Sequence, residues 1–266
     1  MEIPGTGNDW RAWLSERAAE LQSAVLFLTR LPFPRGKAAA GVALAEAPLA
    51  QAVWAFPVAG VLVGAAGAVV YALAHRLGVP PWPAAALALA ATMVTTGALH
   101  EDGLADTADG FGGGTTREQK LGIMHDSRTG AYGVCALALS ILLRASALAS
   151  LADTTLVVPA LIAAHGAARA VMPVFMTLVP PARRDGLSAT AGRPSGVTAA
   201  VAALLGILVT AICLGPAGAA LATILLVVVL ALMARLSFRQ IGGQTGDTLG
   251  ALEQVGEIVV LLVAAS

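Results

Sequence analysis

The sequence has little charge and few cysteines. Of its 266 residues, 12% are charged and 57% are hydrophobic, whereas a soluble domain carries roughly 25% charged residues. The sixteen basic and sixteen acidic side chains cancel, so no overall positive field argues for a nucleic-acid partner. The two cysteines, Cys135 and Cys213, lie in apolar runs, and nothing in their positions suggests a disulfide framework. The chain therefore lacks the polar surface that a water-soluble protein needs.

Long apolar runs are present instead. A membrane-spanning helix needs about 20 mainly apolar residues. Seven segments approach this length: Val53–Ala74, Pro83–Leu99, Ala131–Ala152, Leu156–Val179, Val197–Gly215, Ala217–Ala234 and Leu249–Ala265. Before them, Trp10–Arg30 has the pattern of an amphipathic helix that lies on a membrane surface. The sequence predicts an all-α, polytopic integral membrane bundle of about seven transmembrane helices. Residues 1–52 form its interfacial segment and residues 53–266 its bundle, within a single domain.

The positive charges are distributed unevenly among the loops. If the seven segments span a membrane, thirteen arginines and lysines lie on one side and one on the other. Because such residues accumulate in cytoplasmic loops, the N-terminus is predicted to be cytoplasmic. The polar loops at residues 100–130, 180–196 and 237–250 fall on that same side and can converge on one site.

The first of these loops opens with the stretch HEDGLADTADGFGGG, residues 100–114, which holds four carboxylates within nine residues. On a helix, Asp102, Asp106 and Asp109 would share one face, where like charges three and four residues apart are destabilising. A divalent cation would compensate them, and carboxylate oxygens suit Mg²⁺ or Mn²⁺. A solvated acidic loop without a ligand is the alternative.

The glycines that follow suggest a phosphate site. A glycine run exposes backbone N–H groups that can surround a phosphate, and Arg117 and Lys120 supply positive charge nearby. An ordinary glycine-rich turn is the alternative. The candidate phosphate-binding glycines are Gly112, Gly113 and Gly114.

Two charged residues precede the next apolar run, in the motif IMHDSRTG. Asp126 is a candidate general base or a further metal ligand, and Arg128 is a candidate phosphate partner. The alternative for Asp126 is an N-cap of the helix that follows.

Several charges lie inside predicted spans, where they are costly and usually functional. Arg144 is in the middle of one span, and His165 and Arg169 are four residues apart in another. Arg169 is a candidate phosphate partner, with a structural ion pair as the alternative. Glu253 and Glu257, one turn apart in the last span, are predicted to face the interior toward these arginines.

Asp247 follows glycines in the motif GGQTGD, on the predicted cytoplasmic side. It either completes the metal site or caps the last helix. Two classes of function fit these features: a membrane phosphotransferase that acts on a diphosphate with Mg²⁺, and an ion-coupled transporter. A transporter would place its acids near the bilayer midplane, whereas most acids here cluster at one edge. The pattern favours the phosphotransferase.

The motifs FLTRLPFP, DGLADTADG, IMHDSRTG and GGQTGD together resemble the cobalamin synthase family, the adenosylcobinamide-GDP ribazoletransferases, from about Phe27 to Glu257. His125 stands where that family more often has lysine. The segment DGLAD is also similar to the start of the CDP-alcohol phosphotransferase motif, but the longer pattern is not completed. A CDP-alcohol phosphotransferase-like lipid enzyme is therefore the alternative.

The resemblance implies a multi-pass enzyme of the bacterial cytoplasmic (inner) membrane that depends on Mg²⁺, and it is compatible with a homo-oligomer. Its reaction joins adenosylcobinamide-GDP to α-ribazole or its 5′-phosphate, releasing GMP and giving adenosylcobalamin or its 5′-phosphate, a late step of vitamin B12 biosynthesis. The expected metal ligands are Asp102, Asp106, Asp109 and Asp247. The expected catalytic residues are Asp106 and Asp126. The expected phosphate partners are Arg117, Arg128 and Arg169, beside the three glycines.

Overall fold

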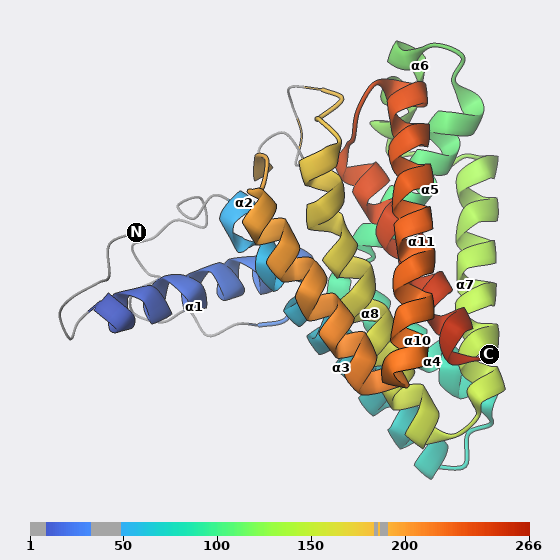
Figure 1. Ribbon diagram of the computed structural model, residues 1–266. Coiled ribbons are helices and arrows are strands. Elements are labelled where there is room, and N and C mark those ends of the chain that lie inside the picture. The colour runs from blue at the N-terminus through green and yellow to red at the C-terminus, as the bar shows by residue number, and fades with distance from the viewer. Residues whose placement is uncertain (1–8, 33–48, 184–185, 187–190) are drawn as a thin grey trace.

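The computed structural model describes residues 9–32, 49–183, 186 and 191–266, and most of these are helical (Figure 1). The elements are α1 (Asp9–Leu28), α2 (Leu49–Ala52), the 3₁₀ turn η1 (Val53–Ala55), α3 (Phe56–Arg76), α4 (Pro81–Thr96), α5 (Leu99–Gly113), α6 (Arg117–Met124), α7 (Ala131–Leu151), α8 (Thr154–Leu178), α10 (Gly196–Ile241) and α11 (Gly246–Ala264). Within the described ranges, strand-like pairing is limited to one bridge between Pro181 and Gln244. The predicted all-α fold is confirmed.

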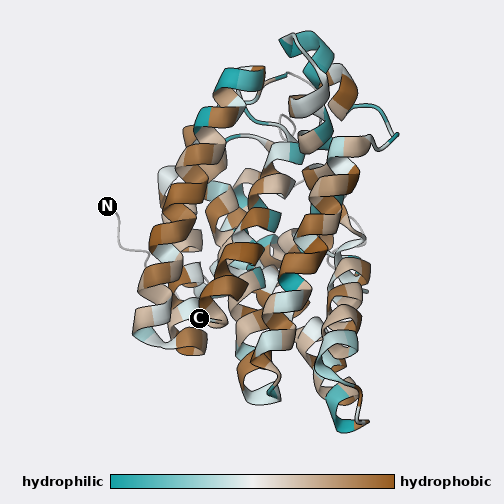
Figure 2. Ribbon diagram, turned by 90° about the vertical axis from the view of Figure 1, so that its right-hand side faces the viewer, coloured by the Kyte–Doolittle hydropathy of each residue, from teal (hydrophilic) through white to brown (hydrophobic). Residues whose placement is uncertain are grey.

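Four stretches of the described chain are long and apolar enough to cross a membrane: Leu49–Arg76, Ala131–Leu151, Thr154–Leu178 and Gly196–Ile241. Helices α4 and α5 qualify as a fifth span only when taken together, and a bend of 91° separates them. Figure 2 shows hydrophobic residues along most of the long helices and hydrophilic residues gathered toward the ends of the bundle. The membrane character of the chain agrees with the sequence, but the predicted count of seven spans is not confirmed.

Helix α10 accounts for part of the difference between the predicted and observed numbers of spans. Its 46 residues would extend about 69 Å as a straight helix, twice what a bilayer core of about 30 Å requires. The backbone is non-helical at Gly215, with φ 73° and ψ 173°, and Pro216 follows. The chain reverses direction at this point (Figure 1). The predicted spans Val197–Gly215 and Ala217–Ala234 are therefore the two arms of α10.

The bend between α4 and α5 sets the direction in which the acidic helix α5 runs. Gly97 and Ala98 both have left-handed backbone conformations, with φ 67° and 57°. The N–H of Arg30, just after α1, donates to the carbonyl of Thr95 at 2.7 Å. The predicted span Pro83–Leu99 ends at this bend. Helix α5 consequently leaves α4 at a steep angle, and its acids lie outside the four candidate spans.

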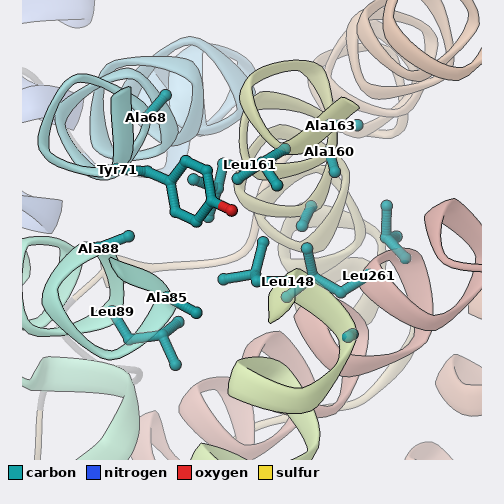
Figure 3. Packing of buried hydrophobic residues seen from close by; sticks show 14 of the residues in the cluster. Ala68, Tyr71, Ala85, Ala88, Leu89, Leu148, Ala160, Leu161, Ala163 and Leu261 are labelled. Atoms are coloured by element: carbon teal, nitrogen blue, oxygen red, sulfur yellow. The ribbon is translucent and has the colours of Figure 1, made fainter. Parts of the chain in front are cut away.

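Small residues bring α3 and α8 close together. A Cβ atom at Gly64 would lie 2.6 Å from the carbonyl oxygen of Leu161 and 2.9 Å from the Cα atom of Ile162, so this backbone approach requires glycine. Beside this interface, the side chains of Tyr71 on α3, Leu161 on α8 and Leu148 on α7 belong to one hydrophobic core (Figure 3). The core thus supports α8, which contributes buried charges to the site described below.

Helix α1 matches the predicted amphipathic helix in position. Its C-terminal half is buried against the bundle through residues such as Leu28, whereas Trp10 and Trp13 near its start are exposed. Glu20 fixes the helix, because its carboxylate accepts from Trp54 Nε1 at 2.5 Å and pairs with Arg17 at 2.8 Å. In Figure 1 the N-terminal half of α1 extends away from the other helices, and contact with a membrane surface remains a prediction.

Candidate active site

Helices α5 and α11 touch at two glycines. A Cβ atom at Gly103 would lie 2.9 Å from the carbonyl oxygen of Asp247 and 3.1 Å from its Cα atom. One at Gly250 would lie 3.2 Å from the Cα atoms of Gly103 and His100. Larger residues would force the helices apart. The close approach places Asp102, next to Gly103 on α5, beside the first turn of α11, although the two segments are far apart in sequence.

Asp106 completes this group of acids from the following turn of α5. Burial, together with the charges of Asp102, Asp247 and Asp109, raises the pKa of Asp106 to about 7. Burial also raises the pKa of Asp247, against the opposing effects of Thr245 and Arg183. Carboxylates that disfavour one another's ionised forms in this way create the negative potential that a divalent cation neutralises. The donor set, all carboxylate oxygen, fits Mg²⁺.

The N-cap of α11, which was the alternative role for Asp247, is Thr245. Its hydroxyl accepts from the Thr248 N–H, and the Thr248 hydroxyl accepts from the Thr245 N–H in return. The Asp247 carboxylate instead accepts from the Thr245 hydroxyl at 3.1 Å and faces Arg183 Nη2 at 3.7 Å. Because another residue makes the cap, Asp247 is available for the acidic group.

Asp109 has a different environment from the other acids. It is buried, and both carboxylate oxygens accept backbone N–H groups at the start of α7, from Gly130 at 2.6 Å and Gly133 at 2.9 Å. These bonds satisfy donors that a helix N-terminus leaves without partners. These contacts give Asp109 an anchoring role, so Asp102, Asp106 and Asp247 are the stronger candidate ligands, and the expected metal role of Asp109 stays a prediction.

Two of the three glycines after the acidic stretch pack tightly against neighbouring residues. Gly112 and Gly113 belong to α5, so their N–H groups run along the helix axis. A Cβ atom at Gly112 would lie 2.7 Å from the Tyr132 ring, and one at Gly114 would lie 2.8 Å from the Lys120 nitrogen. Close packing explains Gly112 and Gly114, whereas a Cβ atom at Gly113 would meet only Ile123 Cδ1 at 3.4 Å. These contacts count against an open phosphate-binding loop, and the phosphate role of the three glycines stays a prediction.

The two basic residues after the glycines, Arg117 and Lys120, donate hydrogen bonds to backbone carbonyls. Lys120 is buried, and its Nζ donates to the carbonyls of Phe111 at 3.1 Å and Gly114 at 2.6 Å. Arg117 Nε donates to the Ile241 carbonyl at 2.7 Å, and its Nη2 donates to the Ala182 carbonyl. Arg117 thus ties α6 to the end of α10, but its side chain is 49% exposed, and a phosphate role for its Nη1 stays a prediction.

Asp126 and Arg128 form an exposed pair. Arg128 donates through Nη2 to Asp126 Oδ2 at 2.5 Å and through its backbone N–H to Oδ1 at 3.1 Å. These bonds lower the pKa of Asp126 to about 2. A carboxylate with so low a pKa is a weak base, so the pairing counts against the expected catalytic role. Nor does Asp126 cap α7, whose N-cap position is occupied by Gly130.

A separate network of buried charges connects α5, α7, α8 and α11. Arg144 Nη1 on α7 contacts Glu257 Oε2 at 2.9 Å and Glu101 Oε1 at 3.3 Å. Arg169 Nη1 on α8 contacts Glu253 Oε1 at 2.5 Å and Glu257 Oε1 at 3.1 Å. The prediction that Glu253 and Glu257 face these arginines is confirmed. Since its guanidinium is engaged here, Arg169 has the structural ion-pair role that was the alternative to phosphate binding.

Part of this network has the composition of a metal site. His165, Glu253 and Glu257 offer ligand atoms that all lie within 4.8 Å of one another. Arg169 Nη1 lies among them, 3.1 Å from His165 Nδ1 as well as in contact with both carboxylates. A guanidinium thus already supplies the positive charge there, which leaves Asp102, Asp106 and Asp247 as the better candidates for a metal site.

The sequence did not reveal the polar extension of the network. Gln254 Nε2 donates to Glu101 Oε1 at 3.3 Å and to Glu253 Oε2 at 3.1 Å. Ser140 Oγ in turn donates to Gln254 Oε1 at 3.1 Å. The one available signal was position, because Gln254 lies between two glutamates already predicted to face the interior. The network joins four helices and fixes α5 relative to α11.

A cavity of about 130 Å³ adjoins the acids. Asp102 and Asp247 form part of its wall, at the crossing of α5 and α11. The other lining residues are mostly apolar: Phe27, Leu28, Leu49, Phe56, Leu99, His100, Gly103, Met172, Met176, Ala191, Gly246, Leu249 and Gly250. A group of carboxylates and an apolar recess are therefore adjacent.

Comparison with known proteins identifies the family. The family model described as cobalamin-5-phosphate synthase matches residues 20–265. The chain belongs to the cobalamin-5-phosphate synthase family. Adenosylcobinamide-GDP ribazoletransferase from Bradyrhizobium diazoefficiens is 58% identical over 264 residues, which cover 99% of this chain and 98% of the relative. The protein of the same name from Mesorhizobium japonicum is 55% identical over 91% of this chain and 90% of the relative.

No solved structure matches the chain. The family resemblance predicted from the four motifs is confirmed, and membership of this transferase family is favoured over the transporter and CDP-alcohol phosphotransferase-like alternatives. Membership of the cobalamin synthase family concerns the whole described bundle, because the match extends from within α1 to the end of α11.

Proposed function

We propose that the protein joins adenosylcobinamide-GDP to α-ribazole or its 5′-phosphate and releases GMP, at the crossing of α5 and α11. The observation that carries this proposal is the meeting of Asp102, Asp106 and Asp247 beside an apolar cavity. It occurs in a chain whose relatives are named for this transfer. A diphosphate donor needs compensation of its negative charge, and a nucleoside acceptor needs an apolar surface for its base.

We propose Mg²⁺ as the cofactor, held by Asp102, Asp106 and Asp247. The fit rests on the donor set and on the mutual repulsion that raises the pKa of Asp106. When bound, Mg²⁺ would neutralise negative charge that develops on the diphosphate oxygens.

The protein residues then have separate tasks. A ribose hydroxyl oxygen bonds to the phosphorus on the cobinamide side, the bond between that phosphorus and the GMP oxygen breaks, and GMP leaves. Asp106 accepts the hydroxyl proton in this proposal, because burial and the neighbouring carboxylates raise its pKa in the metal-free site, whereas the bonds from Arg128 lower the pKa of Asp126. The glycine contact between α5 and α11 keeps the acids in register.

The assay for this function uses purified protein with adenosylcobinamide-GDP, α-ribazole and Mg²⁺. We expect one GMP released for each cobalamin formed, and loss of both products when EDTA is added. Release of CMP from a CDP-alcohol with a lipid acceptor, without GMP release, would instead support the CDP-alcohol phosphotransferase alternative.

The proposed location is the bacterial cytoplasmic membrane, with the N-terminus and the acidic site on the cytoplasmic side. We expect a cysteine at Glu118, whose side chain is 78% exposed on α6, to resist an impermeant maleimide in intact spheroplasts and to react after lysis. Lys120 is unsuitable for this test because it is buried. A cysteine at Leu77, which is 82% exposed after α3, is the control expected to react from outside. Labelling of position 118 in intact spheroplasts would show that the orientation in the membrane is opposite to the proposed one.

The helix crossing gives a further prediction. Gly103→Val should lower transfer about 100-fold, because the new side chain collides with the Asp247 backbone, and misplacing catalytic groups by about 1 Å costs that much. Gly122→Ala is the matched control, since a Cβ atom there meets nothing within 4 Å. Transfer rates of the two variants, measured on folded protein, decide the point: an active Gly103→Val protein would mean that the crossing does not position the site.

A further inference from the structure

The cavity beside the acids has the walls of a site for a flat aromatic ring. The rings of Phe27 and Phe56 stack at one side, with centroids 6.1 Å apart and planes 11° apart. Met172 and Met176, one turn apart on α8, line another part of the wall. Aromatic faces and polarisable thioethers pack well against planar apolar rings. Such a lining, with few polar groups, is typical of a small-molecule site.

One polar side chain in this wall has a buried nitrogen without a hydrogen-bond partner in the part of the chain that the structure describes. His100 lines the cavity and is 2% exposed. Its Nδ1 lies 3.3 Å from Arg169 Nη2, and because arginine can only donate, Nδ1 accepts and Nε2 carries the hydrogen. Within the described residues, Nε2 has no hydrogen-bond partner. A buried donor in this state is costly unless a ligand supplies an acceptor.

We propose that the cavity binds the base of the nucleoside substrate, the benzimidazole ring of ribazole, with His100 Nε2–H donating to its unsubstituted ring nitrogen. This proposal rests on the proposed function and adds the location of one substrate. The ribose then lies toward Asp102 and Asp247, which share the cavity wall. The hydroxyl that attacks phosphorus is thereby delivered to the acidic group.

The chemistry of the other substrate parts argues against their binding here. Guanine presents several donors and acceptors, and the mainly apolar wall would leave most of them unpaired. A corrin ring is much larger than a cavity of about 130 Å³. A benzimidazole nucleoside offers a flat apolar surface with one ring acceptor, and the wall offers apolar side chains with one unpaired imidazole donor.

The first part of the test fills the cavity. Met176→Trp should raise the dissociation constant for α-ribazole by about ten-fold or more, measured by equilibrium dialysis of labelled α-ribazole against purified full-length protein. The KM for adenosylcobinamide-GDP should stay within about two-fold. Leu178→Trp is the matched control: it lies on the same helix, is 62% exposed, and should change neither value.

The second part tests the hydrogen bond. An indole riboside, in which a carbon replaces the free ring nitrogen, should bind the unaltered protein about five-fold more weakly than α-ribazole. His100→Leu should remove this discrimination, and His100→Gln, which keeps an N–H donor, should retain part of it. Equal binding of the two ligands by the unaltered protein would overturn the assignment of the ring nitrogen to His100.

The outcomes separate this proposal from the proposed function. If the unaltered protein binds α-ribazole but releases no GMP, the proposed function fails and the cavity assignment is still decided by Met176→Trp. If transfer occurs and Met176→Trp leaves α-ribazole binding unchanged, or raises the KM for adenosylcobinamide-GDP instead, the cavity assignment fails while the function stands. Failure of the unaltered protein to bind either α-ribazole or its 5′-phosphate would overturn both.

Discussion

Asp106→Asn should lower the transfer rate by about 1,000-fold while the protein still folds. Asp106 is the acid on which Asp102 and Asp247 both act electrostatically, and the amide removes one charged ligand and the proposed proton acceptor. Loss of metal-based charge stabilisation costs several kcal/mol of transition-state energy, and about 4 kcal/mol corresponds to that factor. The measurement is GMP release over a range of Mg²⁺ concentrations, with thermal unfolding in detergent as the test of folding.

Two variants make this result specific. Glu118→Gln, the same chemical change at an exposed acid of α6, should retain normal turnover. Asp109→Asn should mainly destabilise the protein, because the amide replaces a carboxylate that holds two N–H groups of α7. Near-normal turnover of Asp106→Asn at low Mg²⁺ would exclude Asp106 from the metal site.

Arg144→Met should destabilise the protein by about 3–5 kcal/mol, the cost of leaving the partner of a buried ion pair without its opposite charge. Arg144 is fully buried, and the substitution removes the guanidinium from both Glu101 and Glu257. The network would then hold three carboxylates and one arginine. The expected result is a large fall in unfolding temperature, or in the yield of folded protein, in detergent.

A second substitution distinguishes lost charge balance from lost packing. Glu101→Gln alone should be mild, because it leaves two carboxylates facing two arginines. Combined with Arg144→Met, it should recover part of the lost stability, since it removes one of the unpaired charges. A double variant that is no more stable than Arg144→Met alone would show that packing, and not charge, dominates at this position.

Local periodicity in the sequence predicted much of the fold. Apolar length located the long helices, including both arms of α10, because a span of about 20 residues leaves a clear signal. The four-residue spacing of Glu253 and Glu257 correctly predicted that they face buried arginines. The number of membrane spans was harder to predict from the sequence. Helix α11 carries Asp247, Glu253 and Glu257, so its membrane placement depends on partners from other helices that hydropathy does not record.

The candidate site was predictable where helix geometry decides it and not where tertiary contacts do. The one-face spacing of Asp102 and Asp106 is visible in the sequence, and the charge bias of the loops brought Asp247 to the same side. The separate role of Asp109 depends on the start of α7 lying beside it. Likewise, the glycine run at 112–114 suggests a phosphate loop, and only the tertiary structure shows Tyr132 packed against Gly112 and Lys120 against Gly114.

The position of a bound metal tests the central claim most directly. Mn²⁺ replaces Mg²⁺ at oxygen-rich sites, and its anomalous scattering identifies it in a crystal of the protein grown with adenosylcobinamide-GDP. We predict an anomalous peak within coordination distance of Asp102, Asp106 or Asp247 and of the diphosphate. A peak among His165, Glu253 and Glu257 would contradict the account, and so would a metal held by the diphosphate without contact to Asp102, Asp106 or Asp247.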